Sequence, residues 1–236
     1  MSLADTRLTI LQIVNEVRRK MGLGNASSLT QDSFSTNAVD YLNDVIAEVS
    51  DYGDWQEMLV ETVVTASTSV INYTITTDTT AAVKNIHEVA FYQRIAAMHL
   101  VTLDDIRRLQ RTNTRGVPTQ WAIVGVDNVT TGNPYFRVFP TPAASQNNQP
   151  FSVLYFKKPR IYTTSDAAVI PEFPSRVLVQ GLLAMIMKDE SRGTPEQVYQ
   201  LEYARFKEVL ADTFNRFNGD TGSDTFFRPP YTRARP

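Results

Sequence analysis

The sequence contains no cysteine and only two histidines, His87 and His99. Without cysteine, the chain has no disulfide bond, no thiolate metal ligand and no cysteine nucleophile, and this composition agrees with folding in a reducing cytoplasm. The two histidines are far apart in the sequence, and neither stands in an HExxH or HxH pattern. We therefore expect no metal site.

Long apolar runs and a surplus of basic residues are also missing. No run approaches the roughly 20 apolar residues that a membrane span needs. Residues Met1–Asp5 lack the basic and apolar segments of a signal peptide, so we expect a soluble protein. The formal net charge of −2 argues against tight nucleic-acid binding by the chain as a whole, and it disfavours a free-standing DNA-binding regulator.

The common motifs of nucleotide binding and nucleophilic catalysis are absent as well. The sequence has no P-loop, no glycine-rich GxGxxG segment between a strand and a helix, and no GxSxG segment. We therefore assign no catalytic residue and no metal ligand, and we expect no cofactor.

Three pairs of acidic residues leave one enzymatic alternative open. A glycosidase needs two carboxylates about 5–10 Å apart across a cleft, whereas acids at helix ends are ordinarily caps or solvated residues. The pairs are Asp51/Asp54, Asp104/Asp105 and Asp189/Glu190. An enzyme that cleaves glycans therefore remains an alternative function.

The segment from Pro171 to Phe217 predicts two helices joined by a tight turn, around which the rest of the chain is organised. The first helix has apolar residues around much of its circumference, which is typical of a buried helix. The turn is Ser191-Arg192-Gly193, and Thr194-Pro195-Glu196-Gln197 has the pattern of a helix cap. The second helix carries aromatic and aliphatic residues along one side, so we expect a long helical hairpin that serves as a scaffold.

Two amphipathic helices are predicted nearer the N-terminus, over Thr6–Met21 and Thr36–Tyr52. Arg18 and Arg19 fall in the last turn of the first of them, where the helix dipole favours cations. Trp55 follows a glycine just past the end of the second helix. We predict that this tryptophan is a core anchor that holds the first strand against the helix.

Between Trp55 and Arg160 the apolar period changes to two, which predicts a β-rich region. The predicted strands span residues 59–65, 70–75, 83–92, 120–126, 134–139 and 151–156. The first two should form a hairpin and the last three a meander, and Thr102 should cap one short helix. In the third strand, alternation predicts a shared face for Val83, Asn85, His87, Val89 and Phe91.

These elements predict an α+β protein, because the strands are grouped rather than interleaved with helices. We expect helices from both ends of the chain to form one bundle, into which an antiparallel β-domain is inserted. Residues 1–55 and 165–217 are assigned to the helical bundle, 56–164 to the β-rich domain with its short helix, and 218–236 to a flexible, extended C-terminal tail.

The predicted tail begins with an acidic, glycine-containing hinge and continues with aromatic residues, prolines and arginines. Disorder is the ordinary interpretation of a terminus. However, aromatic and arginine residues are enriched at binding hot spots, and proline reduces the entropy that a segment loses on docking. We predict that the tail docks onto a partner. The docking residues are Phe226, Phe227, Arg228, Pro229, Pro230, Tyr231, Arg233 and Arg235.

Four arginines gather in the predicted short helix and the loop that follows it. The ordinary interpretation is a solvated helix face with its flanking loop. The functional alternative is contact with DNA phosphates or with a neighbouring subunit. These residues are Arg107, Arg108, Arg111 and Arg115.

The order of these elements resembles that of the head-to-tail adaptor, or head completion, proteins of tailed bacteriophages, which include tail accessory and tail tubular A proteins. The likeness spans nearly the whole chain, through short motifs. These are Ala38 to Ile46 leading into Asp54-Trp55, Gly116-Val117-Pro118 with Trp121, Phe139-Pro140-Thr141-Pro142, Val153 to Pro159, Ile170-Pro171, and the helix pair with Asp189 and Tyr203.

The resemblance implies a structural virion protein that is not an enzyme and that connects the capsid to the tail. The alternative is a virion-associated peptidoglycan hydrolase or a glycan-binding tail protein, a role that some adaptor relatives have been assigned. It implies a ring, of twelve copies, below the portal protein, with double-stranded DNA passing through the lumen during ejection and contacted without sequence specificity. The implied partners are the portal, onto which the C-terminal tail docks, and a downstream tail or nozzle protein. The protein would be assembled in the host cytoplasm, would reside in the virion neck, and would contact no membrane.

Overall fold

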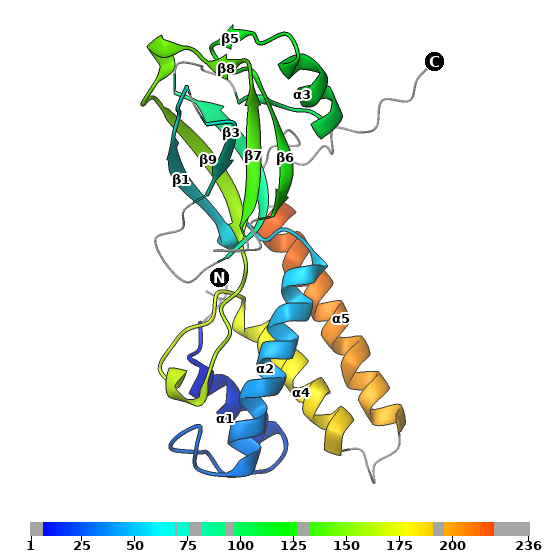
Figure 1. Ribbon diagram of the computed structural model, residues 1–236. Helices are drawn as coiled ribbons and strands as arrows, with labels where there is room; N and C mark the ends of the chain where they lie inside the picture. Colours follow the sequence, from blue (N-terminus) through cyan, green and yellow to red (C-terminus); the bar gives the residue numbers. More distant parts are fainter. Residues whose placement is uncertain are drawn as a thin grey trace, which may run out of the picture. The chain divides into compact units, whose positions relative to one another are not determined.

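The computed structural model divides the chain into two compact units. The helical unit comprises residues 1–56 and 162–236, and the β unit comprises residues 57–161. All described strands lie in the β unit (Figure 1), and the protein is α+β, as predicted. The structure describes residues 7–68, 70–75, 82–92, 97–126, 133–190 and 196–219.

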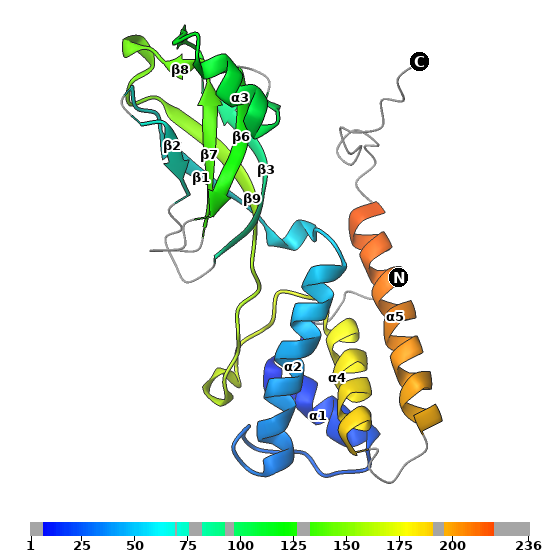
Figure 2. The same cartoon turned by 45° about the vertical axis from the view of Figure 1, so that its right-hand side comes forward.

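Within the described residues, four helices build the helical unit, and the third of them along the chain is central. The helices are α1 (Ile10–Lys20), α2 (Ser33–Tyr52), α4 (Ser175–Glu190) and α5 (Glu196–Gly219). Helix α4 packs against the other three, and α2, α4 and α5 lie side by side in both Figure 1 and Figure 2. The predicted turn over 191–193 and the cap residue Thr194 lie outside the described residues.

Glycine permits unusually close helix contacts in this unit. A Cβ atom on Gly181 of α4 would lie 2.5 Å from Cγ1 of Val45 in α2 and 2.9 Å from Cε2 of Phe206 in α5. A Cβ atom on Gly53, just after α2, would collide with the ring of Phe214. Real Cβ atoms do not approach other heavy atoms so closely, so both contacts require a residue without a side chain.

Helix α1 starts at a reciprocal cap. The amide of Gln12 donates to the Thr9 hydroxyl at 3.3 Å, and the Thr9 amide donates to the Gln12 side-chain oxygen at 2.8 Å. This capping box fixes the first turn, so the helix begins at Ile10 and the predicted start at Thr6 is too early. The buried apolar residues of α1 are Ile10, Ile13, Val14 and Val17.

Helix α2 begins before the predicted Thr36, because Asp32 caps its first turn. The Asp32 side chain accepts a hydrogen bond from the Ser35 amide at 2.8 Å. The helix ends at Tyr52, as predicted. Its buried residues recur at helical spacing and comprise Ser35, Ala38, Val39, Leu42, Val45, Ile46, Val49 and Ser50.

Trp55 is the centre of an aromatic cluster in the helical unit. The side chain is 1% exposed and donates its indole N–H to the carbonyl of Val49 at 2.8 Å. Its ring centroid lies 5.5 Å from that of Phe173, 5.1 Å from Phe214 and 6.5 Å from Phe217. Trp55 is therefore a core residue, as predicted, but its ring partners come from α5 and the segment before α4 rather than from the first strand.

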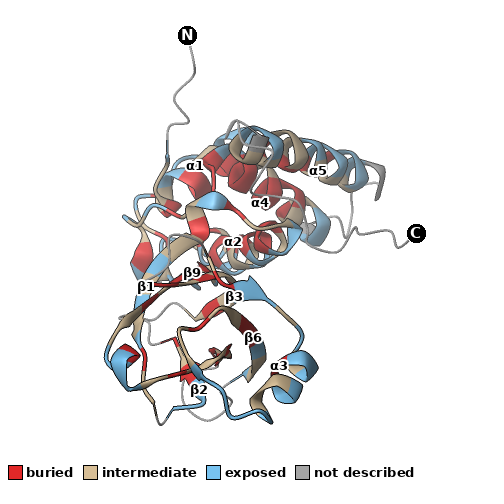
Figure 3. Ribbon diagram, turned by 90° about the horizontal axis from the view of Figure 1, so that it is seen from above, coloured by how far each residue is buried: buried red, intermediate tan, exposed pale blue. Residues whose placement is uncertain are grey.

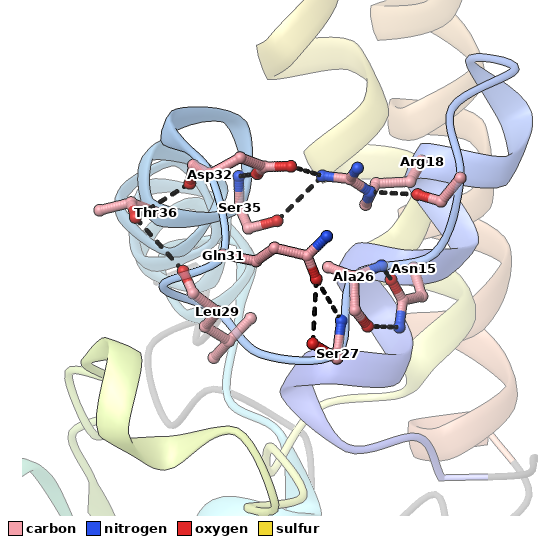
Figure 4. Close-up of polar contacts among 10 residues, drawn as sticks. Asn15, Arg18, Ala26, Ser27, Leu29, Gln31, Asp32, Ser35 and Thr36 are labelled. Atoms are coloured by element: carbon pink, nitrogen blue, oxygen red, sulfur yellow. Dashed lines mark hydrogen bonds and ion pairs between the residues drawn. The ribbon is translucent and has the colours of Figure 1, made fainter.

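Polar side chains of α1 hold the loop that connects α1 to α2 (Figure 4). The Asn15 side chain donates to the Ala26 carbonyl at 3.0 Å and accepts from the Ala26 amide at 2.7 Å. Arg18 is 7% exposed, and its guanidinium donates to the Gly24 carbonyl at 2.6 Å and to the Asp32 carboxylate at 2.7 Å. The predicted role of Arg18, to complement the helix dipole, is therefore incomplete, because this side chain also organises the loop.

The segment that follows the β unit is held by a similar asparagine contact. Asn43 of α2 donates to the Tyr162 carbonyl at 2.9 Å and accepts from the Tyr162 amide at 2.9 Å. Further along, the Ile10 amide donates to the Val169 carbonyl at 2.9 Å. These bonds satisfy backbone groups of a segment that has little regular secondary structure.

The described part of the β unit contains two larger sheets and one pair of short strands. One sheet has the order β1-β9-β3 and the other β2-β7-β6-β4, while β5 pairs with β8. The strands are β1 (Leu59–Thr65), β2 (Asn72–Thr74), β3 (Val83–Phe91), β4 (His99–Leu100), β5 (Arg115–Gly116), β6 (Gln120–Val126), β7 (Pro134–Phe139), β8 (Thr141–Pro142) and β9 (Pro150–Lys157). The long pairings are antiparallel, as predicted, but the two-residue pairings β4–β6 and β5–β8 are parallel.

Two predicted strand arrangements are wrong. Strands β1 and β2 do not form a hairpin, because β1 pairs with β9 and β2 pairs with β7. The predicted meander is limited to β6 and β7, because β9 lies between β1 and β3 in the other sheet. The central position of β9 matches its high burial, since a strand in the middle of a sheet has a neighbour on each edge.

Strand β3 departs from simple alternation. Its register against β9 shifts between Val83 and Asn85 and again between Ile86 and Glu88. Because a bulge changes which residues face the core, Ile86 is buried although it was predicted on the opposite face. Asn85, predicted to share the face of Val83, is exposed.

The two larger sheets share one apolar core, and buried residues are drawn in red in Figure 3. Phe151 of β9 lies at its centre, with ring centroids 5.1 Å from those of Tyr73 and Phe91 and 6.0 Å from that of Phe136. The Tyr73 hydroxyl donates to the Ser67 carbonyl at 2.9 Å, and burial raises the pKa of this tyrosine. Residues far apart in the sequence therefore form the centre of the β unit.

Candidate functional site

Helix α3 (Leu103–Gln110) lies on the β unit and carries most of the candidate residues (Figure 2). Its N-cap is Thr102, as predicted, whose hydroxyl accepts from the Asp105 amide at 3.2 Å and donates to the Asp105 carboxylate at 2.6 Å. Ile106 is fully buried, and α3 packs on β6 and β7. The helix therefore presents its remaining side chains from a fixed position on the sheet.

The four predicted arginines are exposed: Arg107 and Arg108 lie in α3, Arg111 directly follows the helix, and Arg115 begins β5. Arg107 lies 3.7 Å from the Asp104 carboxylate, and its side chain is 60% exposed. The other three, Arg108, Arg111 and Arg115, form no ion pair with a described residue. An exposed pair such as Arg107–Asp104 contributes about 0–1 kcal/mol, so these charges add little to the stability of the β unit.

A fifth arginine, Arg137 of β7, joins the four. Its Nε and Nη2 donate to the Asn72 side-chain oxygen at 2.9 and 2.8 Å, and its Nη1 donates to that of Gln110 at 3.0 Å. Amide partners hold the guanidinium in place without cancelling its charge. Burial and the nearby Arg107 lower the pKa of Arg137, which nevertheless stays protonated because a guanidinium loses its proton only at very high pH.

These five residues form what we call the arginine surface: Arg107, Arg108, Arg111, Arg115 and Arg137. Asp104 and Asp105 are the acids of the same helix, so positive charge dominates. The β unit as a whole has ten basic and seven acidic residues, whereas the helical unit has thirteen basic and eighteen acidic residues. The chain therefore combines a positive and a negative unit, which its small net charge conceals.

Three of the acids behind the hydrolase alternative have ordinary structural partners. Asp104 pairs with Arg107, and Asp105 contributes to the helix cap. Asp189 accepts a hydrogen bond from the hydroxyl of Tyr41. These contacts join helices or complete a cap, and they provide no support for a catalytic pair of carboxylates.

The two histidines are separate from each other in the β unit. His87 lies in β3, with its ring centroid 5.5 Å from that of Phe156, and His99 is an exposed residue of β4. Within the part of the chain that the structure describes, no three histidine, aspartate or glutamate side chains gather closely enough to hold a metal ion.

The predicted docking tail lies outside the described residues, apart from its first two positions. Asn218 and Gly219, assigned to the hinge, instead complete helix α5. The Asn218 side chain donates to the Asp54 carbonyl at 3.3 Å. Helix α5 therefore continues past Phe217, where the prediction placed the start of the hinge.

None of the helices described in the structure combines the length and apolarity needed to cross a membrane. The fold is that of an α+β protein whose helical unit is interrupted along the chain by an inserted β unit. A family model described as SU10 adaptor protein matches residues 8–230. The chain therefore belongs to the SU10 adaptor protein family, a family of phage head-to-tail adaptors, as the sequence resemblance predicted. A comparison with curated proteins found no match.

Proposed function

We propose that the protein forms a ring under the phage portal, connects the capsid to the tail, and lets DNA pass through its lumen. The match to an adaptor family over residues 8–230 is the observation that carries this proposal. A ring of twelve copies, assembled in the host cytoplasm, is the expected form. Its partners are the portal above and a tail or nozzle protein below, and the proposal includes no catalytic step.

The helical unit is the proposed wall of the ring. Helix α4 is mostly buried among its neighbours, so it gives the wall a rigid centre. Helix α5 packs with one side and leaves Val198 39% exposed and Leu201 54% exposed on the other. Exposed apolar residues on a long helix are suited to contact with an adjacent subunit.

The C-terminal segment 220–236 is the proposed attachment to the portal. Between Thr225 and Pro236 it contains aromatic residues, prolines and arginines and no acid. Aromatic and arginine side chains supply much of the binding energy at protein interfaces. This composition supports docking onto another protein.

In the proposed ring, DNA passes through the lumen and is not tightly bound by its wall. The helical unit carries eighteen acidic and thirteen basic residues. Affinity for the phosphate backbone grows with the number of cations that a surface presents. A wall with an acidic surplus would therefore let DNA move past without strong adhesion.

The proposal is tested by mixing the protein with its portal and imaging the product by negative-stain electron microscopy. We expect rings on the portal with the full chain, and none with a chain that ends at Gly219 and so keeps α5 intact. Circular dichroism must show the same helix content and melting temperature for both chains. A full chain that stays monomeric with portal present would contradict the ring, and a shortened chain that binds normally would contradict the tail's role.

A further inference from the structure

Among the described residues of the β unit, the arginine surface has charges that no ion pair neutralises. Arg108, Arg111 and Arg115 are exposed and form no ion pair with a described residue, and Arg137 is held by amides alone. Packing of α3 on β6 and β7 fixes the backbone from which the arginines of α3 project, and hydrogen bonds to Asn72 and Gln110 hold the guanidinium of Arg137 in place. A charged group that is already held in place loses less entropy on binding, which favours its use in a contact.

The helical unit presents a complementary row of acids on α2. Asp40, Asp44 and Asp51 are exposed, and none of them forms an ion pair with a described residue. The helix contains no lysine or arginine at all. In contrast, Glu48 of the same helix forms an ion pair with Lys207 and accepts a hydrogen bond from the Tyr203 hydroxyl at 2.6 Å.

The three aspartates share one face of α2. Positions 40, 44 and 51 project within about 40° of one another at 100° per residue. The opposite face is buried through Leu42, Val45, Ile46 and Val49, so the acids point away from the core of the helical unit. Like charges one turn apart weaken a helix, so this acidic stripe does not stabilise α2 itself.

The spacing of the two charged sets is compatible. Arg107 and Arg111 are four residues apart near the end of α3, as are Asp40 and Asp44 on α2, and such pairs are about 5–6 Å apart between Cβ atoms. Arginine forms two parallel hydrogen bonds to a carboxylate, which gives such a contact direction as well as attraction.

We propose that the arginine surface of one copy docks on the acidic stripe of α2 in a second copy. The inference rests on the proposed ring, and it names the contact that joins neighbours. Each copy carries both halves, so the contact is head-to-tail, and head-to-tail contacts close into a ring when the rotation between copies allows it.

Charge reversal in two separate chains tests this pairing. One chain carries Arg108→Glu, Arg111→Glu and Arg115→Glu, and the other carries Asp40→Lys, Asp44→Lys and Asp51→Lys. All six side chains are exposed, so we expect both chains to keep the melting temperature of the wild type. Self-association of each, measured by sedimentation velocity with and without portal, should weaken by roughly a hundredfold, because juxtaposed like charges cost several kcal/mol.

Mixing the two chains should restore assembly, because the unchanged arginines of one meet the unchanged aspartates of the other, and the two reversed sets attract as well. A single chain with all six substitutions should also assemble. Lys158→Glu, an exposed charge reversal elsewhere on the β unit, is the control and should leave assembly unchanged, in contrast to Arg111→Glu.

Three results would overturn the inference, and they are distinguishable. If the variant with all six substitutions assembles but the mixture of the two chains does not, the arginines and the aspartates pair within one chain. If arginine reversal reduces retention of duplex DNA and leaves ring formation intact, the partner is DNA. Rings of normal stability from both reversed chains would contradict this contact without contradicting the proposed function. A wild-type chain that never associates, even with portal, would contradict both the contact and the proposed function.

Discussion

The helical unit and the β unit differ in what they leave exposed. In the helical unit, ion pairs connect elements or neighbouring turns, and they include Arg18–Asp32, Lys207–Glu48 and Arg205–Glu202. Among the described residues, the charges without an ion pair on α2 are acids, whereas those on α3 and the residues just after it are mainly arginines. Each unit therefore stabilises itself with part of its polar groups, and the two leave exposed charges of opposite sign on these helices.

The two units also use different means of stabilisation. The helical unit depends on close helix contacts at Gly181 and on side chains that bond loop backbone, such as Asn15 and Asn43. The β unit depends on one aromatic core assembled from strands distant in the sequence. The single tryptophans Trp55 and Trp121, one in each unit, allow the two to be followed separately by fluorescence.

The strongest test of this comparison is Phe151→Ala in the core of the β unit. Removing a fully buried phenylalanine leaves a cavity and should lower the free energy of unfolding of the β unit by about 3–5 kcal/mol. The measurement is urea unfolding followed through Trp121 in a Trp55→Phe background. The transition reported by Trp55, in a Trp121→Phe background, should stay in place, and an equal shift of both would show that the units are one cooperative body.

Gly181→Ala should affect the opposite unit. The new Cβ would overlap Val45 and Phe206, so the helices must move apart, and overpacking of this kind costs about 1–3 kcal/mol. The shift should appear in the Trp55 signal. Gly125→Ala in β6 is the matched control, because a Cβ there has no atom within 4 Å, and its unfolding should match that of the wild type.

The asparagine contacts can be compared between the units as well. Asn43→Ala should lower the free energy of unfolding of the helical unit by about 1–3 kcal/mol. The reason is that the backbone amide and carbonyl of Tyr162 would lose their partner at a part-buried position. Asn72→Ala, on an exposed residue of β2, should change stability by less than about 0.5 kcal/mol. Differential scanning calorimetry distinguishes these values, and equal effects would contradict the separate roles of the two asparagines.

The smallest predicted effect is the pH dependence of the loop before α2. Hydrogen bonds from the Ser35 amide and hydroxyl, together with Arg18, lower the pKa of Asp32 below its ordinary value. A lowered pKa in the folded state means that this stabilisation is present above the unfolded pKa and is lost as the pH falls through the folded value. The melting temperature of the wild type should therefore exceed that of Asp32→Ala at neutral pH, and the difference should shrink in acid. A difference that is constant with pH would contradict a role for the ionised carboxylate.

The elements could be predicted from the sequence where local patterns determine them. The apolar period located α2 and β1, and the cap at Thr102 marked the start of α3. The starts of α1 and α2 were misplaced, because Thr9 and Asp32 act through hydrogen bonds that periodicity does not report.

Strand partners and individual contacts were not predictable in the same way. The order β1-β9-β3 joins strands separated by most of the β unit, and alternation specifies a buried face without specifying a neighbour. For the same reason Arg137 was missed: it joins the other arginines only because β7 lies beside α3. The bridge that Asn133 makes between the Val83 amide and the Ile75 carbonyl likewise depends on residues far apart along the chain.

The mass of the complex formed with portal tests the central claim most directly. Mass photometry of portal mixed with an excess of the chain should show the portal carrying twelve additional copies at physiological ionic strength. The chain that ends at Gly219 should leave the mass of the portal unchanged. Portal that keeps its original mass in the presence of excess full-length chain would contradict the assignment of this protein as the adaptor beneath it.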